Sequence, residues 1–233
     1  MNILVACDSA FNFTYRANID ALRLLGNVSF FSPLSDSLLP PCDLLYLPGG
    51  YPELFLTEIA ENVGMRTQIR DYAENGGHVF AECGGFMYLC SDIDGQPMCG
   101  VLPFSATMSG AHLHLGYRQM EWGEEGKQRL FVKGHEFHYS AIADGECPHA
   151  GAIETLHIQS SATGRHVDTP VYRYKNVIAG YTHWYWADKT LDELRILFGM
   201  DKMQHATDEK QLAKSGGNSW QRVGGIAGEE QMK

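Results

Sequence analysis

The chain has 233 residues, of which 44% are hydrophobic and 20% are charged, and its net charge at pH 7 is −10. This length and composition predict a soluble protein with a full hydrophobic core, and the acidic balance argues against nucleic-acid binding because no basic stripe is available to neutralise phosphates. We expect neither a signal peptide nor a membrane span, because the first residues have no basic region and no apolar run is long enough to cross a bilayer. The six cysteines form no Cys-x-x-Cys pair, so we expect reduced thiols in a cytoplasmic protein.

The first third of the chain alternates between predicted strands and predicted helices. Apolar runs predict strands at 2–6, 28–31, 43–47 and 78–82. Helical periodicity predicts helices at 16–25, 53–60 and 66–74. This alternation predicts an α/β fold with a mainly parallel sheet and helices on both of its faces. In such sheets, functional sites form at the carboxyl ends of the strands.

After about residue 97 the alternation gives way to short strands and turns. We expect strands at 115–118, 130–132, 137–139, 171–174 and 178–181, and a last amphipathic helix at 191–198. This half is expected to complete the sheet with antiparallel additions and to build one wall of a pocket. We therefore expect a folded domain over residues 1–200, followed by a polar, mobile tail over residues 201–233.

Residues 79–89 contain the clearest candidate for a catalytic group. A predicted strand ends at Cys83, Gly84 and Gly85 follow, and a helix-compatible segment comes next, which is the layout of a nucleophile elbow. Glycine permits the tight turn and lets its backbone N–H approach a substrate. The positive end of the following helix is expected to lower the thiol pKa. A buried cysteine at the end of a core strand is the alternative interpretation.

A cysteine nucleophile needs a base. The chain has ten histidines, and His183 follows a predicted strand late in the sequence, where the base often comes after an elbow nucleophile in chain order. Because Trp184, Tyr185 and Trp186 follow it, an aromatic surface patch is the alternative.

The reaction also needs donors for the oxyanion. Gly49 and Gly50 follow the strand at 43–47, and Gly84 follows the nucleophile, so all three offer backbone N–H groups near Cys83. A simple turn is the alternative for Gly49 and Gly50, since Pro-Gly-Gly is common in turns.

Two histidine pairs have spacings that would suit metal ligands: His112 with His114, and His135 with His138. No His-Glu-x-x-His signature is present and no cysteine lies near either pair, so we expect structural or substrate-facing histidines and no metal site. The phosphate-binding sequence Gly-x-x-x-x-Gly-Lys-Ser/Thr is also absent, which gives no support for ATP hydrolysis by such a loop.

Five motifs occur in order and together resemble a known family. They span residues 31–34 (Phe-Ser-Pro-Leu), 47–53 (Leu-Pro-Gly-Gly-Tyr-Pro-Glu), 81–89 (Ala-Glu-Cys-Gly-Gly-Phe-Met-Tyr-Leu), 115–118 (Leu-Gly-Tyr-Arg) and 134–140 (Gly-His-Glu-Phe-His-Tyr-Ser). Across roughly residues 1 to 190 the chain is similar to the C-terminal glutamine amidotransferase domain of cobyrinic acid a,c-diamide synthase. The resemblance implies a flavodoxin-like, class I (triad-type) amidotransferase fold and a role in cobalamin biosynthesis.

The resemblance also implies roles for single residues. Cys83 would attack the side-chain amide of glutamine and form a γ-glutamyl thioester, and His183 would take the thiol proton and return one to the leaving ammonia. Gly50 and Gly84 would hold the oxyanion. The glutamine site, a substrate pocket or an interdomain surface is implied for further residues: Gly49, Tyr51, Glu53, Arg118, His135, Glu136, His138 and Tyr139.

Two departures from the family pattern bear on these expectations. The usual synthase carries its Mg-ATP and corrin site in a first half that this chain does not resemble. The resemblance therefore implies no cofactor in this chain, an ATP-binding synthase subunit or domain as partner, and contact with the corrin through that partner. The family's Tyr-x-His-x-His pattern has Tyr185 as its last member here, no acid lies two residues after His183, and Asp188 is the remaining candidate for orienting the base.

Three functions follow from these observations. The leading interpretation is the glutaminase, ammonia-supplying component of a cobyrinic acid a,c-diamide synthase. The second is a Cys-elbow hydrolase of the related peptidase and redox superfamily, acting on peptides or reactive carbonyls. The third is a non-catalytic binding protein built on an amidotransferase-like domain, which Tyr185 and the missing ATP half would fit.

Overall fold

The computed structural model describes residues 1–122, 129–144, 152–156 and 158–200. A compact unit runs from Met1 to Gly199, and the predicted tail at 201–233 lies outside the described residues. In the described part of the chain, no helix has the length and apolar character needed to cross a membrane.

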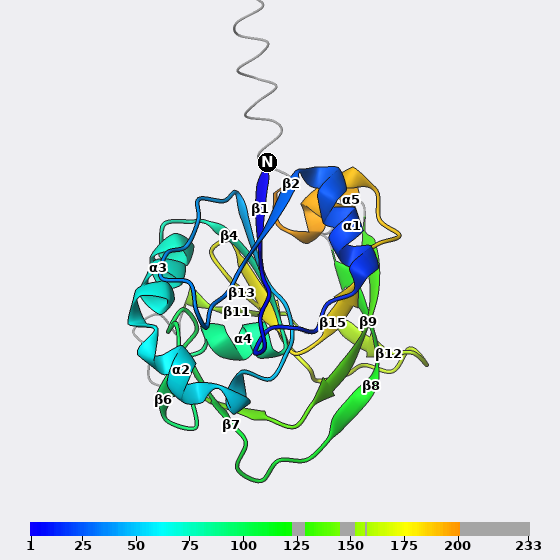
Figure 1. Cartoon of the computed structure of the whole chain (residues 1–233). Coiled ribbons are helices and arrows are strands. Elements are labelled where there is room, and N and C mark those ends of the chain that lie inside the picture. Colours follow the sequence, from blue (N-terminus) through cyan, green and yellow to red (C-terminus); the bar gives the residue numbers. More distant parts are fainter. Residues whose placement is uncertain (123–128, 145–151, 157, 201–233) are drawn as a thin grey trace, which may run out of the picture. The chain divides into compact units, whose positions relative to one another are not determined.

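Within the described residues, a seven-stranded sheet forms the centre of this unit (Figure 1). Five strands pair in parallel, in the order β2 (Asn27–Phe31), β1 (Asn2–Ala6), β3 (Leu44–Leu47), β4 (His78–Glu82) and β14 (Val177–Gly180). Two antiparallel strands extend the sheet beyond β14, namely β13 (Val171–Tyr174) and β11 (Glu154–Leu156). The predicted parallel sheet with antiparallel additions is confirmed, and Cys83 follows a strand with neighbours on both sides.

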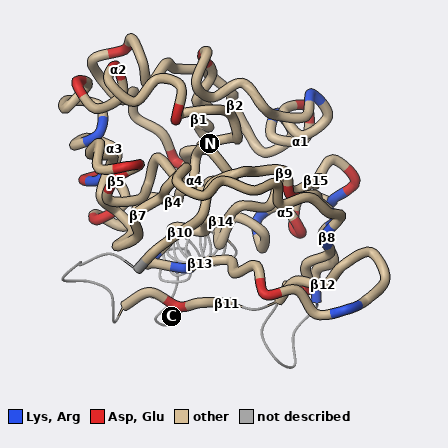
Figure 2. The backbone as a smooth tube through the Cα atoms, turned by 90° about the horizontal axis from the view of Figure 1, so that it is seen from below, with Lys and Arg blue, Asp and Glu red and all other residues tan. Residues whose placement is uncertain are grey.

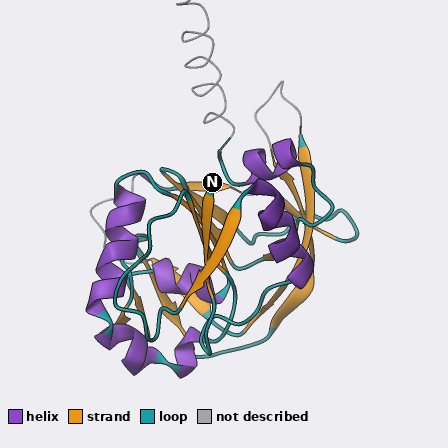
Figure 3. Ribbon diagram, turned by 45° about the horizontal axis from the view of Figure 1, so that its top comes forward, coloured by secondary structure: helices purple, strands orange, loops and turns teal. Residues whose placement is uncertain are grey.

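Helices cover both faces of this sheet (Figure 3). One face packs against α2 (Leu56–Glu61), α3 (Val63–Glu74) and α4 (Gly84–Leu89), and the other lies under α1 (Arg16–Leu25) and α5 (Leu191–Leu197). The helix predicted from residue 53 starts later, because a 3₁₀ turn, η1 (Pro52–Leu54), precedes α2. Proline fits the first turn of a helix but cannot donate a backbone hydrogen bond within it.

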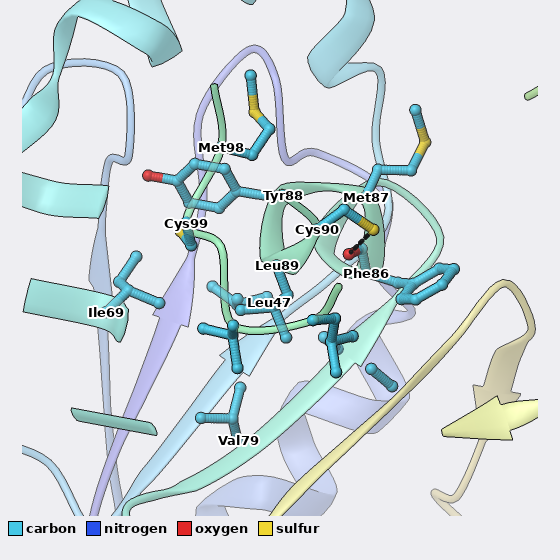
Figure 4. Close-up of a cluster of buried hydrophobic side chains, with 14 of the residues drawn as sticks. Leu47, Ile69, Val79, Phe86, Met87, Tyr88, Leu89, Cys90, Met98 and Cys99 are labelled. Atoms are coloured by element: carbon cyan, nitrogen blue, oxygen red, sulfur yellow. Dashed lines mark hydrogen bonds between the residues drawn. The ribbon is translucent and has the colours of Figure 1, made fainter. Parts of the chain in front are cut away.

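The short helix α4 is buried along its whole length. Figure 4 shows Leu89 beside Leu47 of β3, and Phe86, Met87 and the β4 residue Val79 belong to the same buried cluster. An isolated helix of six residues would be unstable in water. Packing therefore fixes α4, and with it the turn that carries Cys83.

Two smaller sheets are built from strands that lie between residues 92 and 185. One has the order β10 (Ala141–Asp144), β7 (Phe104–Thr107), β5 (Asp92–Ile93) and β6 (Gln96–Pro97). The other has the order β12 (Gln159–Ser161), β8 (His114–Trp122), β9 (Leu130–His138) and β15 (His183–Tyr185). The strands predicted at 130–132 and 137–139 are one strand, because β9 pairs with β8 along nine consecutive residues.

The charged positions are dispersed over the described elements. Figure 2 shows Lys and Arg at separated places along the chain, with Asp and Glu among them. In the described part of the chain, charges of both signs are therefore interspersed.

Candidate active site

Cys83 lies at the turn between β4 and α4, and its backbone has φ 47° and ψ −107°. A residue with a Cβ seldom adopts such a positive φ, and holding it there costs roughly 1–3 kcal/mol. The turn is fixed by two backbone hydrogen bonds, from Cys83 N–H to Gly180 O (2.9 Å) and from Met87 N–H to Cys83 O (2.9 Å). The strand–turn–helix layout predicted from the sequence is therefore present, with a strained cysteine at its apex.

The backbones of Gly50 and Gly84 meet beside the Cys83 thiol. A Cβ on Gly84 would lie only 3.0 Å from Gly50 N and 2.8 Å from Pro52 Cδ, so a larger side chain at this position would push the two loops apart. Hydrogen bonds from the N–H groups of Gly84 and Gly50 favour the thiolate of Cys83. Two N–H donors thus converge at the nucleophile, as an oxyanion site requires.

The expectation of a lowered thiol pKa is wrong for this structure. Burial raises the pKa of Cys83 to about 12, and the carboxylate of Glu53 raises it further, against the smaller effect of the two glycine N–H groups. The helix that follows Cys83 has only six residues. Removal of the thiol from water therefore outweighs the favourable dipoles, and the thiol is neutral at pH 7.

His183 is the first residue of β15 and is 4% exposed. Its ring lies against Gly49, where a Cβ would be 2.1 Å from His183 Cε1, and against the ring of Phe13, at a centroid distance of 4.5 Å. His135 stacks on it from β9 at 5.0 Å. Burial lowers the pKa of His183 to about 3, and the two nearby histidines His135 and His138 lower it further, so the imidazole is neutral and able to accept a proton.

One cavity of about 240 Å³ brings these groups together, and it is lined by Phe13, Gly50, Tyr51, Cys83, His135, Phe137 and His183. This volume is below the roughly 300–1,000 Å³ of pockets for drug-sized ligands and suits one small side chain. A larger cavity of about 440 Å³ lies along β8, β9 and β12, but its lining contains no cysteine. We therefore place the candidate active site at the smaller cavity.

The remaining predicted residues divide between the cavity and other places. Glu53 lies in η1, near enough to act on the thiol of Cys83, and burial raises the pKa of its own carboxyl group. Tyr139 is 42% exposed and contacts the ring of Phe137, which lines the cavity. Both are thus next to the cavity without lining it.

Arg118, Glu136 and His138 are absent from the cavity lining. Arg118 and Glu136 form an ion pair in which both side chains are largely buried. His138 stacks on Tyr181 at 3.7 Å, and its Nδ1–H donates a hydrogen bond to Ser140 O at 2.9 Å. Side chains alternate along a strand, so His135 and Phe137 face the cavity while Glu136 and His138 point to the opposite side of β9.

Asp188 does not orient the imidazole. Its carboxylate is 60% exposed and pairs with Lys189 at 3.0 Å. The Nδ1 atom of His183 is buried and has no hydrogen-bond partner among the described residues. Among the described residues, no carboxylate therefore bonds to the imidazole of His183 as the third member of a triad would.

Sequence reasoning missed the aromatic wall of the site. Phe13 follows β1, and Tyr15, two residues later, hydrogen-bonds through its hydroxyl to His135 Nδ1 at 2.8 Å. The loop after β1 leaves the same edge of the sheet as the loops that carry Gly49 and Cys83. That shared edge was a usable signal, because sites in parallel sheets collect there.

Comparison with protein families identifies the relatives of this chain. Residues 2–191 match the model of the CobB/CobQ-like glutamine amidotransferase domain. The chain is similar to a cobyrinate a,c-diamide synthase of Clostridium acetobutylicum, with 36% identity over 78% of this chain and 42% of that protein. It is 39% identical to a hydrogenobyrinate a,c-diamide synthase of Pseudomonas aeruginosa, over 79% of this chain and 41% of the relative. The chain thus spans about two fifths of the length of these relatives.

Solved structures share the fold at low sequence identity. A glutamine amidotransferase crystal structure aligns with a TM-score of 0.52 and 19% identity, covering 84% of this chain and 96% of that one. A glutamine amidotransferase from Thermotoga maritima aligns with a TM-score of 0.51 and 12% identity, covering 91% of this chain and 85% of that one. The fold is therefore that of the class I amidotransferases, and the chain belongs to the family of CobB/CobQ-like glutamine amidotransferase domains.

Proposed function

We propose that this chain is the glutamine-hydrolysing, ammonia-supplying half of a cobyrinic acid a,c-diamide synthase in cobalamin biosynthesis. The observation that carries the proposal is the grouping around one cavity of a thiol, an imidazole and two backbone N–H donors, from Cys83, His183, Gly50 and Gly84. The curated relatives named as cobyrinate a,c-diamide synthases support the choice of pathway.

The proposed reaction begins with attack of Cys83 Sγ on the side-chain amide carbon of glutamine. His183 takes the thiol proton as the S–C bond forms, and the N–H groups of Gly50 and Gly84 donate to the oxygen that becomes negative. The proton then passes to the amide nitrogen, the C–N bond breaks, and ammonia leaves a γ-glutamyl thioester on Cys83. Water attacks the thioester carbon with His183 as its base, which releases glutamate and restores the thiol.

The proposal extends to an ATP-binding synthase subunit or domain as partner. The relatives are more than twice as long as the matched part of this chain, which supports a second functional half. ATP and Mg²⁺ are proposed to bind there, and the corrin is proposed to be amidated there. Among the described residues, no group of three or more His, Cys, Asp or Glu side chains could hold a metal ion.

The neutral state of both Cys83 and His183 supports slow hydrolysis by this chain alone. A docked partner that orders glutamine against the two N–H donors would stabilise the developing charges and raise the rate. We also propose a cytoplasmic location. The cysteines that the structure describes are free thiols, which is typical of a reducing compartment.

The test of the function is glutamate release from glutamine by the purified chain, with and without a candidate ATP-binding partner protein. We expect Cys83-dependent turnover that rises with the partner. Turnover equal to that of Cys83→Ala under both conditions would reject the proposal.

The neutral thiol also favours one alternative, a non-catalytic amidotransferase-like protein. Incubation with a glutamine-mimicking chloroketone separates the two, because a working site alkylates Cys83 and a decayed site does not. Turnover of peptides or reactive carbonyls in the absence of glutamine would instead identify a Cys-elbow hydrolase.

A further inference from the structure

The orientation of His183 must be fixed by something other than a carboxylate on its ring. Its Nδ1 has no hydrogen-bond partner among the described residues, and Asp188 is exposed. Catalysis by a base depends on correct orientation, and a displacement of about 1 Å can cost on the order of a hundredfold in rate. The position of the imidazole therefore depends on how the backbone on either side of His183 is held.

His183 begins β15, and among the described residues this strand pairs with β9 alone, at the edge of its sheet. On its free side, the backbone of Trp184 is held by two buried side chains. Trp184 N–H donates to Glu82 Oε1 at 2.9 Å, and Asn18 Nδ2 donates to Trp184 O at 2.7 Å. These two side chains bond the backbone groups that a neighbouring strand would otherwise pair with. They thereby hold the main chain at the residue that follows His183.

The second oxygen of Glu82 links the same carboxyl group to the loop that covers the imidazole. Tyr46 donates from its hydroxyl to Glu82 Oε2 at 2.8 Å and lies 3.4 Å from Thr14 Oγ1. Thr14 follows Phe13, whose ring packs edge-on against His183. One carboxyl group therefore connects the strand of the base to the loop that packs on its ring.

Glu82 stands at a position where packing alone would favour an apolar residue. It is 2% exposed, and it lies on the same face of β4 as Phe80, which packs against Trp186 and Phe198. Burying a carboxyl group is costly unless hydrogen bonds compensate it. Both of its oxygens are bonded, one to the strand that carries His183 and the other to Tyr46.

We propose that Glu82 is a positioning residue for the base, which holds His183 through the backbone N–H of Trp184 and through Tyr46. This inference rests on the proposed glutaminase function. Glu82 takes over the orienting task of the triad acid, but it acts on the main chain instead of on Nδ1. It precedes the nucleophile directly, so the tip of one strand supplies the thiol and also positions the base.

The test compares Glu82→Ala with Glu82→Gln in the full chain. Glutamine retains an oxygen that can accept from Trp184 N–H, whereas alanine does not. We expect Glu82→Ala to lower kcat for glutamine hydrolysis by roughly tenfold to a hundredfold with KM nearly unchanged, and Glu82→Gln to restore kcat to within about threefold of the wild type. Glu58→Gln, an equally conservative change on the exposed side of α2, is the matched control.

Two outcomes would overturn the proposal: wild-type kcat in Glu82→Ala, or a folded Glu82→Gln that is as impaired as the alanine variant. If Glu82→Ala does not fold, the kcat of Glu82→Gln still tests the proposal. Hydrogen exchange at the Trp184 amide is a second measurement. That amide should be protected in the wild type and in Glu82→Gln, and rapid exchange in the wild type would refute the inference.

Failure of the function and failure of the inference give different results. A wild-type chain without Cys83-dependent turnover refutes the proposed function alone. The positioning of His183 is then decided by the NMR resonances of its imidazole, which should keep one narrow set in Glu82→Gln and shift or broaden in Glu82→Ala. Unchanged resonances in Glu82→Ala would overturn the inference independently of activity.

Discussion

Replacement of Gly49 by alanine tests the contact between the oxyanion loop and the base. The added Cβ would lie 2.1 Å from His183 Cε1, more than 1 Å short of the 3.4 Å at which ordinary contact begins. The imidazole is 4% exposed and is also packed against Phe13 and His135. Either the ring or the loop must therefore move by about 1 Å, which predicts a loss on the order of a hundredfold in glutamine hydrolysis.

The assay is glutamate release by Gly49→Ala under the conditions that give turnover in the wild type, together with circular dichroism and thermal unfolding to establish that the variant is folded. Gly64→Ala is the matched control, because its Cβ would meet nothing closer than 3.6 Å and it lies within α3. Alanine there should stabilise the helix by about 0.5–1 kcal/mol without affecting activity. Full activity in folded Gly49→Ala would refute the packing argument.

Four further predictions follow from the same structure. Cys83→Ala should abolish labelling by the glutamine-mimicking chloroketone, as mass spectrometry of the intact chain would reveal; labelling at another cysteine would contradict the assigned nucleophile. The pKa of His183, lowered to about 3 by burial, predicts that the rate of inactivation by the chloroketone shows no titration midpoint near 6.5, the ordinary pKa of histidine. A midpoint near that pH would show a solvated imidazole. Burial raises the pKa of Glu82 from 4.5 to about 8, so between these pH values the folded state holds a proton that the unfolded chain releases. The free energy of unfolding should therefore fall as pH rises from 4.5 to about 8. Urea unfolding should show a flatter pH dependence for Glu82→Gln, and an unchanged slope would contradict this. Arg118→Ala should lower the free energy of unfolding by roughly 3 kcal/mol, because it leaves the carboxylate of Glu136, 2% exposed, without its cation. A loss below about 1 kcal/mol in urea unfolding would contradict a stabilising role of this ion pair.

The secondary structure of the first 90 residues was well predicted because its signals are local. The helix Arg16–Leu25 and the strands Asn2–Ala6 and His78–Glu82 have the predicted bounds. Each depends on an apolar period or run that neighbouring residues alone supply, and glycines at positions 26 and 77 mark the end of the helix and the start of the strand His78–Glu82. The second half was harder, since β9 spans two short predicted strands, and its central residues are held by pairing with β8 and β15 rather than by their own propensity.

The candidate site shows the same division. The sequence pointed to Cys83 from the strand, the two glycines and the helix-compatible segment that surround it, and to His183 from chain order and family resemblance. The motif at residues 135 to 140 does not show which of its side chains face the site. Strand alternation places His135 in the cavity and Glu136 and His138 on the opposite face. Which face of a strand meets a site depends on register, and pairing across the sheet sets the register.

By itself, the sequence determined the α/β class, the turn that presents Cys83 and the identity of the family, because these depend on spacings within short segments. Only the tertiary structure decided the chemical state of the site. Burial by distant segments raises the pKa of the thiol and lowers that of the imidazole, which reverses the effect expected from the local helix. The bonds from Trp184 and Tyr46 to Glu82 join residues 102 and 36 positions apart, so the proposed support of His183 exists only once the central sheet and β15 have come together.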